Sequence, residues 1–428
     1  MSYSPFRSTA MPNVDAHPEM KTLVALLVMV GTLFACGVPP RPEEVPATSG
    51  NGEVSGPSTK PTQPAPPPPG TAPTLVPTLA PGMHWIEPGA TKGIVLEVPN
   101  EISGGQDIYL ISPDGDPPML LTNLKGIALL SAAGAPNGKW LAIESESIGP
   151  NHEFFSENLS LLSLDTLELK PIIEKTSVIN YAWSPTGDML AYTELMPEGS
   201  GKKIGIYDMG TGGHRVLFQS TPPGGWDVQG WALEGKSLLI AHFLGGGLLF
   251  DEAALLDVST GSVTTIYSDP DKLTQTVIPA PDGRVAIVFK RSSSNLDTSG
   301  IFLLELASGA LTPWIEPGVP DLFIASLPVW SSDGRRVALT VSGQPQKGIS
   351  IPLRIIVIDI TGRRSEVIRV ETPPMLIRPL EWASDDVLIV NNLGGEALDE
   401  VVYSVHADGS QAQKVSWGRF LTTIPITP

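Results

Sequence analysis

Few residues of this chain combine the type and the spacing that chemistry requires. The histidines that follow residue 36 are scattered, without the paired spacing of a metal site: His84, His152, His214, His242 and His406. Two aspartate pairs, Asp114/Asp116 and Asp269/Asp271, lack the further oxygen ligands of a calcium loop, so we interpret them as solvated turns. Residues 244–248 are rich in glycine but have neither the lysine nor the following helix of a phosphate-binding loop. The sequence therefore predicts no catalytic residue, no bound metal and no cofactor.

The only cysteine, Cys36, stands at the end of an apolar stretch near the N-terminus. Lys21 precedes this stretch of about 14 residues, which is too short for a transmembrane helix but fits the central region of a signal peptide. The residues Leu33-Phe34-Ala35-Cys36 resemble a bacterial lipobox. That resemblance implies cleavage before Cys36, acylation of its thiol and attachment of the protein to a membrane. A plain secretory signal with an incidental cysteine is the alternative.

We expect three parts in the chain: a signal peptide over residues 1–35, a tether over residues 36–82 and a folded domain over residues 83–428. We place the true start at Met20, because acidic residues precede it where a signal peptide needs positive charge. Residues 37–82 contain 14 prolines, which remove backbone donors and cannot build a core. This tether is expected to be disordered or in polyproline II. A proline-rich docking peptide is the alternative.

Composition narrows the class of protein. The net charge of −18, from 27 Lys+Arg and 45 Asp+Glu, repels nucleic acid and anionic lipid, so partners of those classes are disfavoured. The chain has 43 glycines and 43 prolines, well above the usual share of roughly 12% for the two together. This content disfavours long helices and favours β structure rich in turns. A single cysteine excludes internal disulfides and a cysteine-based zinc site.

A turn signal recurs from residue 130 to residue 390. Its six copies are spaced by 48 to 52 residues and begin at Ala135, Trp183, Trp231, Ala280, Trp330 and Trp382. Each copy precedes an alternating apolar run, and most are followed by a second pair of such runs around a turn that contains glycine, which accepts the positive φ of hairpin turns. Four short antiparallel strands per 50 residues are typical of a β-propeller blade. We expect the repeated tryptophan to pack between adjacent blades.

The two ends of the repeat predict how the ring closes. Three strands precede the first complete signal: residues 93–97, 107–111 and 119–122. A blade has four strands, so the innermost strand of this first blade is missing. Two further strands complete the last blade and leave the tail 420–428 over. We predict an all-β, seven-bladed propeller of four-stranded antiparallel blades, in which this tail supplies the missing strand. Residues 84–89 are the rival donor.

The repeat resembles that of TolB-type propellers. The likeness is carried by Trp-Ser-Pro-Thr-Gly at 183–187 before an apolar strand, by Ile108-Tyr109 with Gly115, and by Leu121-Thr122. The same repeat builds the propellers of dipeptidyl peptidases and prolyl oligopeptidases. The resemblance implies the fold of residues 83–428, but one fold serves many functions. Those peptidases also carry a Gly-x-Ser-x-Gly elbow, a pentapeptide that does not occur in this sequence.

We expect function to reside in the loops of one propeller face, because loop variation there sets the partner. The longest of these loops are 148–158, 290–300 and 342–352. The candidate binding residues are aromatic or charged side chains in or beside such loops: His152, Phe154, Phe155, Trp226, Asp227, Lys290 and Arg291. The alternative is that Phe154, Phe155 and Trp226 pack under their own loops or into a blade.

The sequence therefore predicts a monomeric, lipid-anchored extracytoplasmic propeller that binds a protein, peptide or glycan, binds no nucleic acid and catalyses nothing. Two other functions stay open. An enzyme, either a lyase or a hydrolase, would need titratable side chains that converge on one face, with a carboxyl group of raised pKa among them. The other is an accessory subunit of a membrane or cell-envelope complex, which a pull-down of the native lipoprotein would reveal.

Overall fold

The computed structural model describes residues 92–426, with gaps at 101–104, 113–117, 125–126, 149–153, 197–200, 222–223, 244–248, 272–273, 291–299, 316–322, 325, 343–352, 362–363, 371–375, 394–399 and 411. The predicted signal peptide (residues 1–35), the predicted tether that begins at Cys36, the expected domain start at residue 83 and the rival donor 84–89 lie outside this part. Among the described residues, no helix is both long and apolar enough to cross a membrane.

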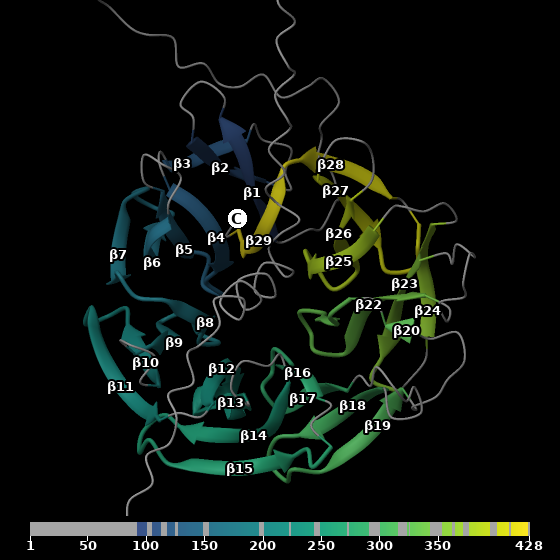
Figure 1. Cartoon of the computed structure of the whole chain (residues 1–428). Helices are drawn as coiled ribbons and strands as arrows, with labels where there is room; N and C mark the ends of the chain where they lie inside the picture. The colour runs from purple at the N-terminus through teal and green to yellow at the C-terminus, as the bar shows by residue number, and fades with distance from the viewer. Residues whose placement is uncertain are drawn as a thin grey trace, which may run out of the picture.

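Antiparallel strands dominate the described chain, and their sheets are arranged around a ring (Figure 1). We name the sheets blades 1 to 7 in chain order. Blade 1 consists of β29 (Arg419–Pro425), β1 (Lys92–Asn100), β2 (Gly105–Ile111) and β3 (Met119–Leu124). Blade 2 consists of β4 (Ile127–Gly134), β5 (Trp140–Ile148), β6 (Phe154–Ser163) and β7 (Leu169–Glu174). Blade 3 consists of β8 (Val178–Trp183), β9 (Met189–Leu195), β10 (Lys202–Asp208) and β11 (Gly213–Ser220).

The remaining blades follow the same order from the innermost to the outermost strand. Blade 4 consists of β12 (Gly225–Ala232), β13 (Ser237–Phe243), β14 (Phe250–Asp257) and β15 (Val263–Ser268), with a 3₁₀ turn at Leu233–Gly235. Blade 5 consists of β16 (Thr274–Pro279), β17 (Val285–Lys290), β18 (Gly300–Glu305) and β19 (Leu311–Ile315). Blade 6 consists of β20 (Phe323–Ile324), β21 (Val329–Trp330), β22 (Arg336–Ser342), β23 (Leu353–Asp359) and β24 (Arg364–Val370). Blade 7 consists of β25 (Leu376–Trp382), β26 (Val387–Leu393), β27 (Glu400–His406) and β28 (Gln413–Trp417).

Two features qualify this regular pattern. Phe250 of β14 pairs with Thr274 of β16, which joins blades 4 and 5 into one eight-stranded sheet. In blade 6, β20 and β21 share the innermost position, because both pair with β22. Dividing the eight-stranded sheet at its single linking pair gives seven blades in the described chain, and this count is our interpretation of the pairing. The all-β propeller predicted from the repeat is confirmed.

The recurrent turn signal forms the tight turn between the first two strands of a blade. Gly138 and Gly187 both have φ of 70°, a left-handed conformation that glycine adopts without a steric penalty. The amide of Gly138 donates to the carbonyl of Ala135 at 2.9 Å, and that of Gly187 donates to Ser184 at the same distance. These turns lie on one face of the ring, which we call the turn face. The opposite face carries the connections between blades and between the second and third strands, and we call it the loop face.

The C-terminal tail closes the ring. β29 pairs antiparallel with β1, and Ile94 lies opposite Thr423 in the register. The strand therefore completes the blade that begins the chain, and both strands lie side by side in Figure 1. The prediction that the tail rather than residues 84–89 supplies the missing strand is confirmed. Closure pairs the inner edge of β1, which would otherwise be left open.

The hydrophobic core lies between neighbouring blades, at interfaces that we call seams. The buried residues of the described chain form seven clusters, and each joins two adjacent blades, as Leu239 of β13 and Val288 of β17 do between blades 4 and 5. Four seams share one further contact, in which a tryptophan Nε1–H donates to a carbonyl of the preceding blade: Trp183 to Ala133 (3.0 Å), Trp231 to Ala182 (2.9 Å), Trp330 to Ile278 (3.1 Å) and Trp382 to Val329 (3.1 Å). The predicted packing of these tryptophans between blades is confirmed.

Candidate functional site

The loop face of blades 3 and 4 holds a buried ion pair between two strand ends. Asp227 is the third residue of β12, and its side chain is 1% exposed. Lys202, the first residue of β10, donates to both carboxylate oxygens of Asp227 at 2.8 and 2.7 Å. Burial raises the pKa of Asp227, against the opposing effect of the Lys202 ammonium. The Lys202 Nζ also lies 4.8 Å from the ring centroid of Phe243, so one cation joins the two blades at this seam.

Next to this pair lies an aromatic and imidazole group. Trp226 stands opposite His242 across β12 and β13, and their ring centroids are 5.2 Å apart. His242 Nδ1 lies 2.7 Å from Asp251 Oδ1, and both side chains are about one-fifth exposed. The carboxylate fixes the orientation of the imidazole ring and leaves Nε2 as its second polar atom. We call Trp226, His242 and Asp251, with the pair Lys202–Asp227, the loop-face cluster.

The structure places Trp226 and Asp227 in a strand, where the sequence predicted a loop. Trp226 and Asp227 were expected in a loop, but both belong to the innermost strand β12. Trp226 packs its half-buried ring against the core cluster between blades 3 and 4, which was the alternative for this residue. Proline and glycine at 222–225 indicated a loop, and the strand begins at the last of these residues.

Blade 5 carries a second buried ion pair at the same face. Lys290, the last residue of β17, lies 3.0 Å from Asp269 Oδ1, and the Asp269 side chain is 0% exposed. The other oxygen of Asp269 accepts from the amide and the hydroxyl of Thr274 at 2.8 and 2.7 Å. The interpretation of Asp269 as part of a solvated turn is therefore wrong. Its side-chain partners Thr274 and Lys290 come from two strands of blade 5, and a local sequence pattern does not contain that information.

The other predicted binding residues are described only in part. Cys36, His152 and Arg291 lie outside the described residues. Phe154 and Phe155 are the first two residues of β6, so this strand begins inside the expected loop 148–158, and their side chains are not described. Of the candidate residues, the structure brings together Trp226 and Asp227, and it places Lys290 in the next blade.

A second group of titratable side chains was missed from the sequence. Ser131 of β4 donates to Glu144 Oε2 of β5 at 2.6 Å, and its Oγ lies 2.7 Å from the hydroxyl of Tyr181 on β8. Burial raises the pKa of Glu144 to about 7, against the hydrogen bond from Ser131, and the carboxylates of Glu157 and Glu146 raise it further. The signal in the sequence is the alternation Glu144-Ser145-Glu146 near the end of a strand, which is equally typical of a solvated strand face.

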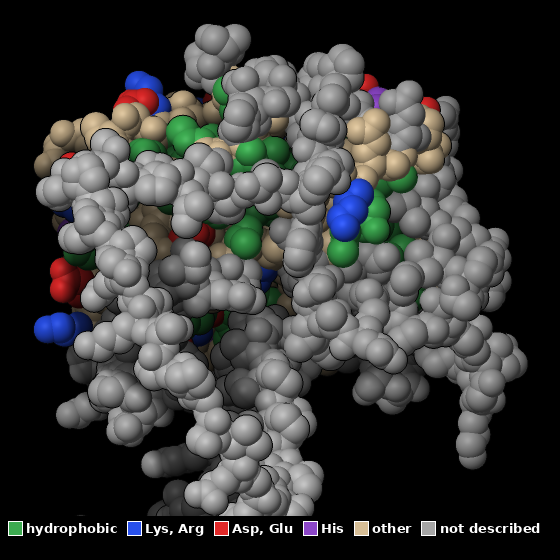
Figure 2. All heavy atoms as spheres, turned by 90° about the horizontal axis from the view of Figure 1, so that it is seen from above, with side chains coloured by type: hydrophobic (Ala, Val, Ile, Leu, Met, Phe, Trp, Pro, Cys, Tyr) green, Lys and Arg blue, Asp and Glu red, His purple; other side chains and the backbone are tan. Residues whose placement is uncertain are grey.

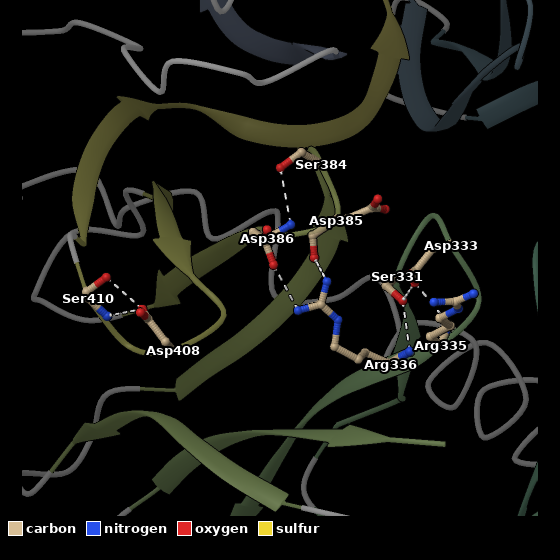
Figure 3. Close-up of polar contacts among 9 residues, drawn as sticks. All are labelled: Ser331, Asp333, Arg335, Arg336, Ser384, Asp385, Asp386, Asp408 and Ser410. Carbon is tan, nitrogen blue, oxygen red and sulfur yellow. Dashed lines mark hydrogen bonds and ion pairs between the residues drawn. The ribbon is translucent and has the colours of Figure 1, made fainter. Parts of the chain in front are cut away.

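The turn face uses its charges to hold blades together. Arg336 of blade 6 donates to Asp386 Oδ1 of blade 7 at 3.0 Å and to the carbonyl of Asp385 (Figure 3). Its guanidinium also lies 5.2 Å from the ring of Trp382. Asp333 accepts from Ser331 Oγ within its own turn at 2.5 Å. These aspartates are structural, as the sequence predicted for Asp333. Since they bind groups of the protein itself, the candidate ligand-binding residues are those of the loop face.

In the view of Figure 2, the few described acidic and basic side chains lie among hydrophobic and uncharged ones. Among the described residues, no group of three or more histidine, cysteine or acidic side chains is arranged to hold a metal ion. The loop-face cluster offers hydrogen-bonding groups and an aromatic ring beside the Lys202–Asp227 ion pair.

Comparison with known proteins places the fold. No known protein family matches the sequence, and no curated protein matches it either. Among solved structures, an oligogalacturonate lyase from Vibrio parahaemolyticus is similar with a TM-score of 0.56 and 13% identity, covering 76% of this chain and 89% of that chain. A prolyl endopeptidase is similar with a TM-score of 0.55 and 12% identity, and the match covers 81% of this chain and 51% of the endopeptidase.

The β-propeller domain of the Trilobed protease from Pyrococcus furiosus is a third similar structure. Its TM-score is 0.50 at 15% identity, over 69% of this chain and 85% of that chain. That domain is described as having an open velcro topology, whereas β29 closes blade 1 here. At these identities the likeness shows the propeller fold, and that fold occurs in enzymes such as the lyase and the peptidases.

Proposed function

We propose that this protein is a lipid-anchored, extracytoplasmic propeller that binds a neutral or basic ligand, a peptide, protein or glycan, through the loop-face cluster. The lipobox ending at Cys36 supports the anchor, and the proline-rich tether would let the propeller reach away from the membrane. The net charge of −18 disfavours a polyanionic ligand. The proposal includes no catalytic step.

One observation carries this proposal: Trp226, His242 and Asp251 lie together beside a Lys–Asp pair that is fully compensated. Compensated charges bind neutral polar groups by hydrogen bonds without the cost of an isolated buried charge. An aromatic ring beside them provides apolar contact area and a face for stacking. Peptide amides and sugar hydroxyls both offer such polar groups with apolar surface between them.

The test is a binding screen with the mature chain that begins at Cys36, against arrays of neutral, basic and acidic peptides and oligosaccharides. We expect binding to neutral or basic members that is weakened at least tenfold by Trp226→Ala. Trp314→Ala is the matched control, because Trp314 is a half-buried tryptophan on the outer strand of blade 5. Binding that survives Trp226→Ala, or that is confined to acidic ligands, would contradict the proposal.

The lipid anchor has a separate test. Cells fed a radioactive fatty acid should label the protein and retain it in the membrane fraction, because acylation of Cys36 adds an apolar chain. Cys36→Ala should abolish both the label and the retention. Labelling that persists in this variant would exclude Cys36 as the attachment site.

An enzyme is the second candidate, and Glu144 is the observation that favours it. A carboxyl group whose pKa is about 7 holds and releases a proton near neutral pH, as a general acid or base must. Turnover of any ligand from the array by the wild type, lost in Glu144→Gln, would support this candidate. Ligands that are bound and recovered unchanged would support binding alone.

A further inference from the structure

A chain of hydrogen bonds crosses the seam between blades 2 and 3. Ser131 has one hydroxyl proton, which it donates to Glu144, so the contact with Tyr181 is made by the Tyr181 hydroxyl donating to Ser131 Oγ. The chain thus runs from blade 3 through Ser131 to a carboxyl oxygen of blade 2. Its direction depends on Glu144 being an acceptor. A protonated Glu144 can donate to Ser131 instead, and Ser131 can then donate to Tyr181.

The surroundings of Glu144 act against its ionised form. Ser131 faces it from β4, and Tyr181 follows from β8. The charged groups that act on it in the described chain are both carboxylates, Glu157 on β6 and Glu146 on β5. Burial and the proximity of Glu157 also raise the pKa of Glu146. Ionisation of Glu144 therefore places a third negative charge beside two others at a partly desolvated seam.

We propose that Glu144, Ser131 and Tyr181 form a protonation switch that holds the seam between blades 2 and 3 closed in mild acid and loosens it above neutral pH. The switch lies on strands that lead to the loop face: β5 ends at Ile148, four residues after Glu144, and β6 resumes at Phe154. An extracytoplasmic protein, as proposed above, meets the pH of its surroundings directly. The switch itself does not depend on that placement or on any ligand.

The sign of the effect follows from proton linkage. The folded protein binds the Glu144 proton with a pKa of about 7, whereas the unfolded chain binds it near the ordinary value of 4.5. Between these values the folded state holds more protons, so its stability falls as the pH rises. The stabilisation is fully present below pH 4.5 and is lost as the pH passes through about 7.

The test is amide hydrogen exchange of the full chain between pH 5.5 and 8.5, corrected for the intrinsic exchange rate at each pH. We expect protection of β4 and β8 to fall about tenfold or more over this range, relative to β12 and β16 in the same sample. Glu144→Gln should hold that protection constant, because the amide does not titrate. Glu174→Gln, an exposed carboxylate change on β7 of the same blade, should behave like the wild type.

Two further measurements separate the switch from a folding defect. The carboxyl stretching band of Glu144, identified by difference against Glu144→Gln, should titrate near pH 7. Ser131→Ala removes the central hydroxyl and should lower the protection of β4 and β8 even in mild acid. Equal protection at both pH values in the wild type, or the same pH-dependent loss in Glu144→Gln, would overturn the proposal. Hydrogen exchange and the carboxyl band are both measured on the protein without a ligand, so failure of the proposed binding function would leave them unaffected.

Discussion

In the described ring, the innermost strands meet in one of two ways at six of the seven seams, and the seventh, between blades 4 and 5, is linked by the strand pair Phe250–Thr274. At four seams, a tryptophan of one innermost strand donates a hydrogen bond to a carbonyl of the innermost strand of the preceding blade. These are the seams between blades 2 and 3, 3 and 4, 5 and 6, and 6 and 7. The two seams on either side of blade 1 use charged side chains. Glu381 of β25 accepts from the amide and the hydroxyl of Thr423 at 2.8 Å each. Arg419 of β29 donates to the carbonyl of Leu129 at 2.6 Å and also binds Glu97.

The difference follows from how each innermost strand reaches its place. A strand inside the repeat is placed next to its neighbour by a short connection. Its contact with the preceding innermost strand is packing and one neutral hydrogen bond, and ion pairs elsewhere on two of these seams, Lys202–Asp227 and Arg336–Asp386, add to that contact. β29 comes from the other end of the chain, and it must find both its partner and its register. Charged groups with several hydrogen bonds fix geometry more sharply than apolar contact does. The closing blade thus gains specificity from Glu381 and Arg419.

The largest effect is expected where a tryptophan seam loses its tryptophan. Trp382 is 1% exposed, and truncation to alanine removes its packing between blades 6 and 7 as well as its hydrogen bond to Val329. We expect Trp382→Ala to destabilise this seam by about 3–5 kcal/mol. Hydrogen exchange of β21 and β25 measures the loss. An effect below about 1 kcal/mol would show that the tryptophan seams do not depend on this residue.

Removing the arginine of the closing blade should have the next largest effect. Arg419→Ala deletes the guanidinium that binds Glu97, whose side chain is 5% exposed, and the carbonyls of β4. We expect a loss of about 3 kcal/mol, because one partner of a largely buried pair is removed. Exchange should increase in β29 and β1 first. If the tryptophan seams exchanged earlier than β29, the comparison between the two kinds of seam would fail.

A milder change addresses the other side of blade 1. Glu381→Gln keeps the size of the side chain but replaces one acceptor oxygen, and each oxygen receives a bond from Thr423. We expect a loss of about 1–2 kcal/mol confined to β29 and β25. Trp382→Phe, which removes the Nε1 donor on the same strand, allows a direct comparison of charged and neutral contacts. If Glu381→Gln and Trp382→Phe lowered the free energy of unfolding equally, the distinction between charged and neutral seam contacts would be contradicted.

The smallest effect concerns the tight turn between the third and fourth strands of blade 2. Leu167 has φ of 57°, at a position where Gly212, Gly261 and Gly309 occupy the equivalent turns of blades 3, 4 and 5. Leu167→Gly should relieve the left-handed strain and stabilise blade 2 by about 0.5–1 kcal/mol. A urea titration of wild type and variant measures the gain. Destabilisation would mean that the exposed Leu167 side chain makes a contact that outweighs the strain.

The repeat made most of the fold predictable. Four of the six turn signals, which follow one another at 48 to 52 residues, begin with a tryptophan, and a contact that is repeated in the fold is also repeated in the sequence: Trp183, Trp231, Trp330 and Trp382. The closing strand could be placed because the first blade lacked a strand and the tail remained. The contacts of Glu381 and Arg419 occur once each, so no periodic pattern in the sequence predicts them.

The candidate site was harder to predict for the same reason. Trp226 and Asp227 were chosen as loop residues because proline and glycine precede them, but their roles depend on Lys202 in the blade before and His242 in the next strand. Glu144 was missed because its partner Ser131 lies on another strand, and Ser131 in turn contacts Tyr181 of another blade. Contacts between side chains of different blades depend on the exact rotation of one blade against the next, and a repeat pattern does not encode that rotation.

The loop-face cluster is built on a ring that is closed by the pairing of β29 with β1. A designed disulfide tests this closure directly. Val95 and Thr422 lie opposite each other in β1 and β29, within the distance that a disulfide spans in an antiparallel pair. In a Cys36→Ala background, Val95→Cys with Thr422→Cys should form an intramolecular disulfide under mild oxidation. Val95→Cys with Lys414→Cys on β28 should not. Absence of the first cross-link in folded protein, or cross-links only between molecules, would contradict the closed ring.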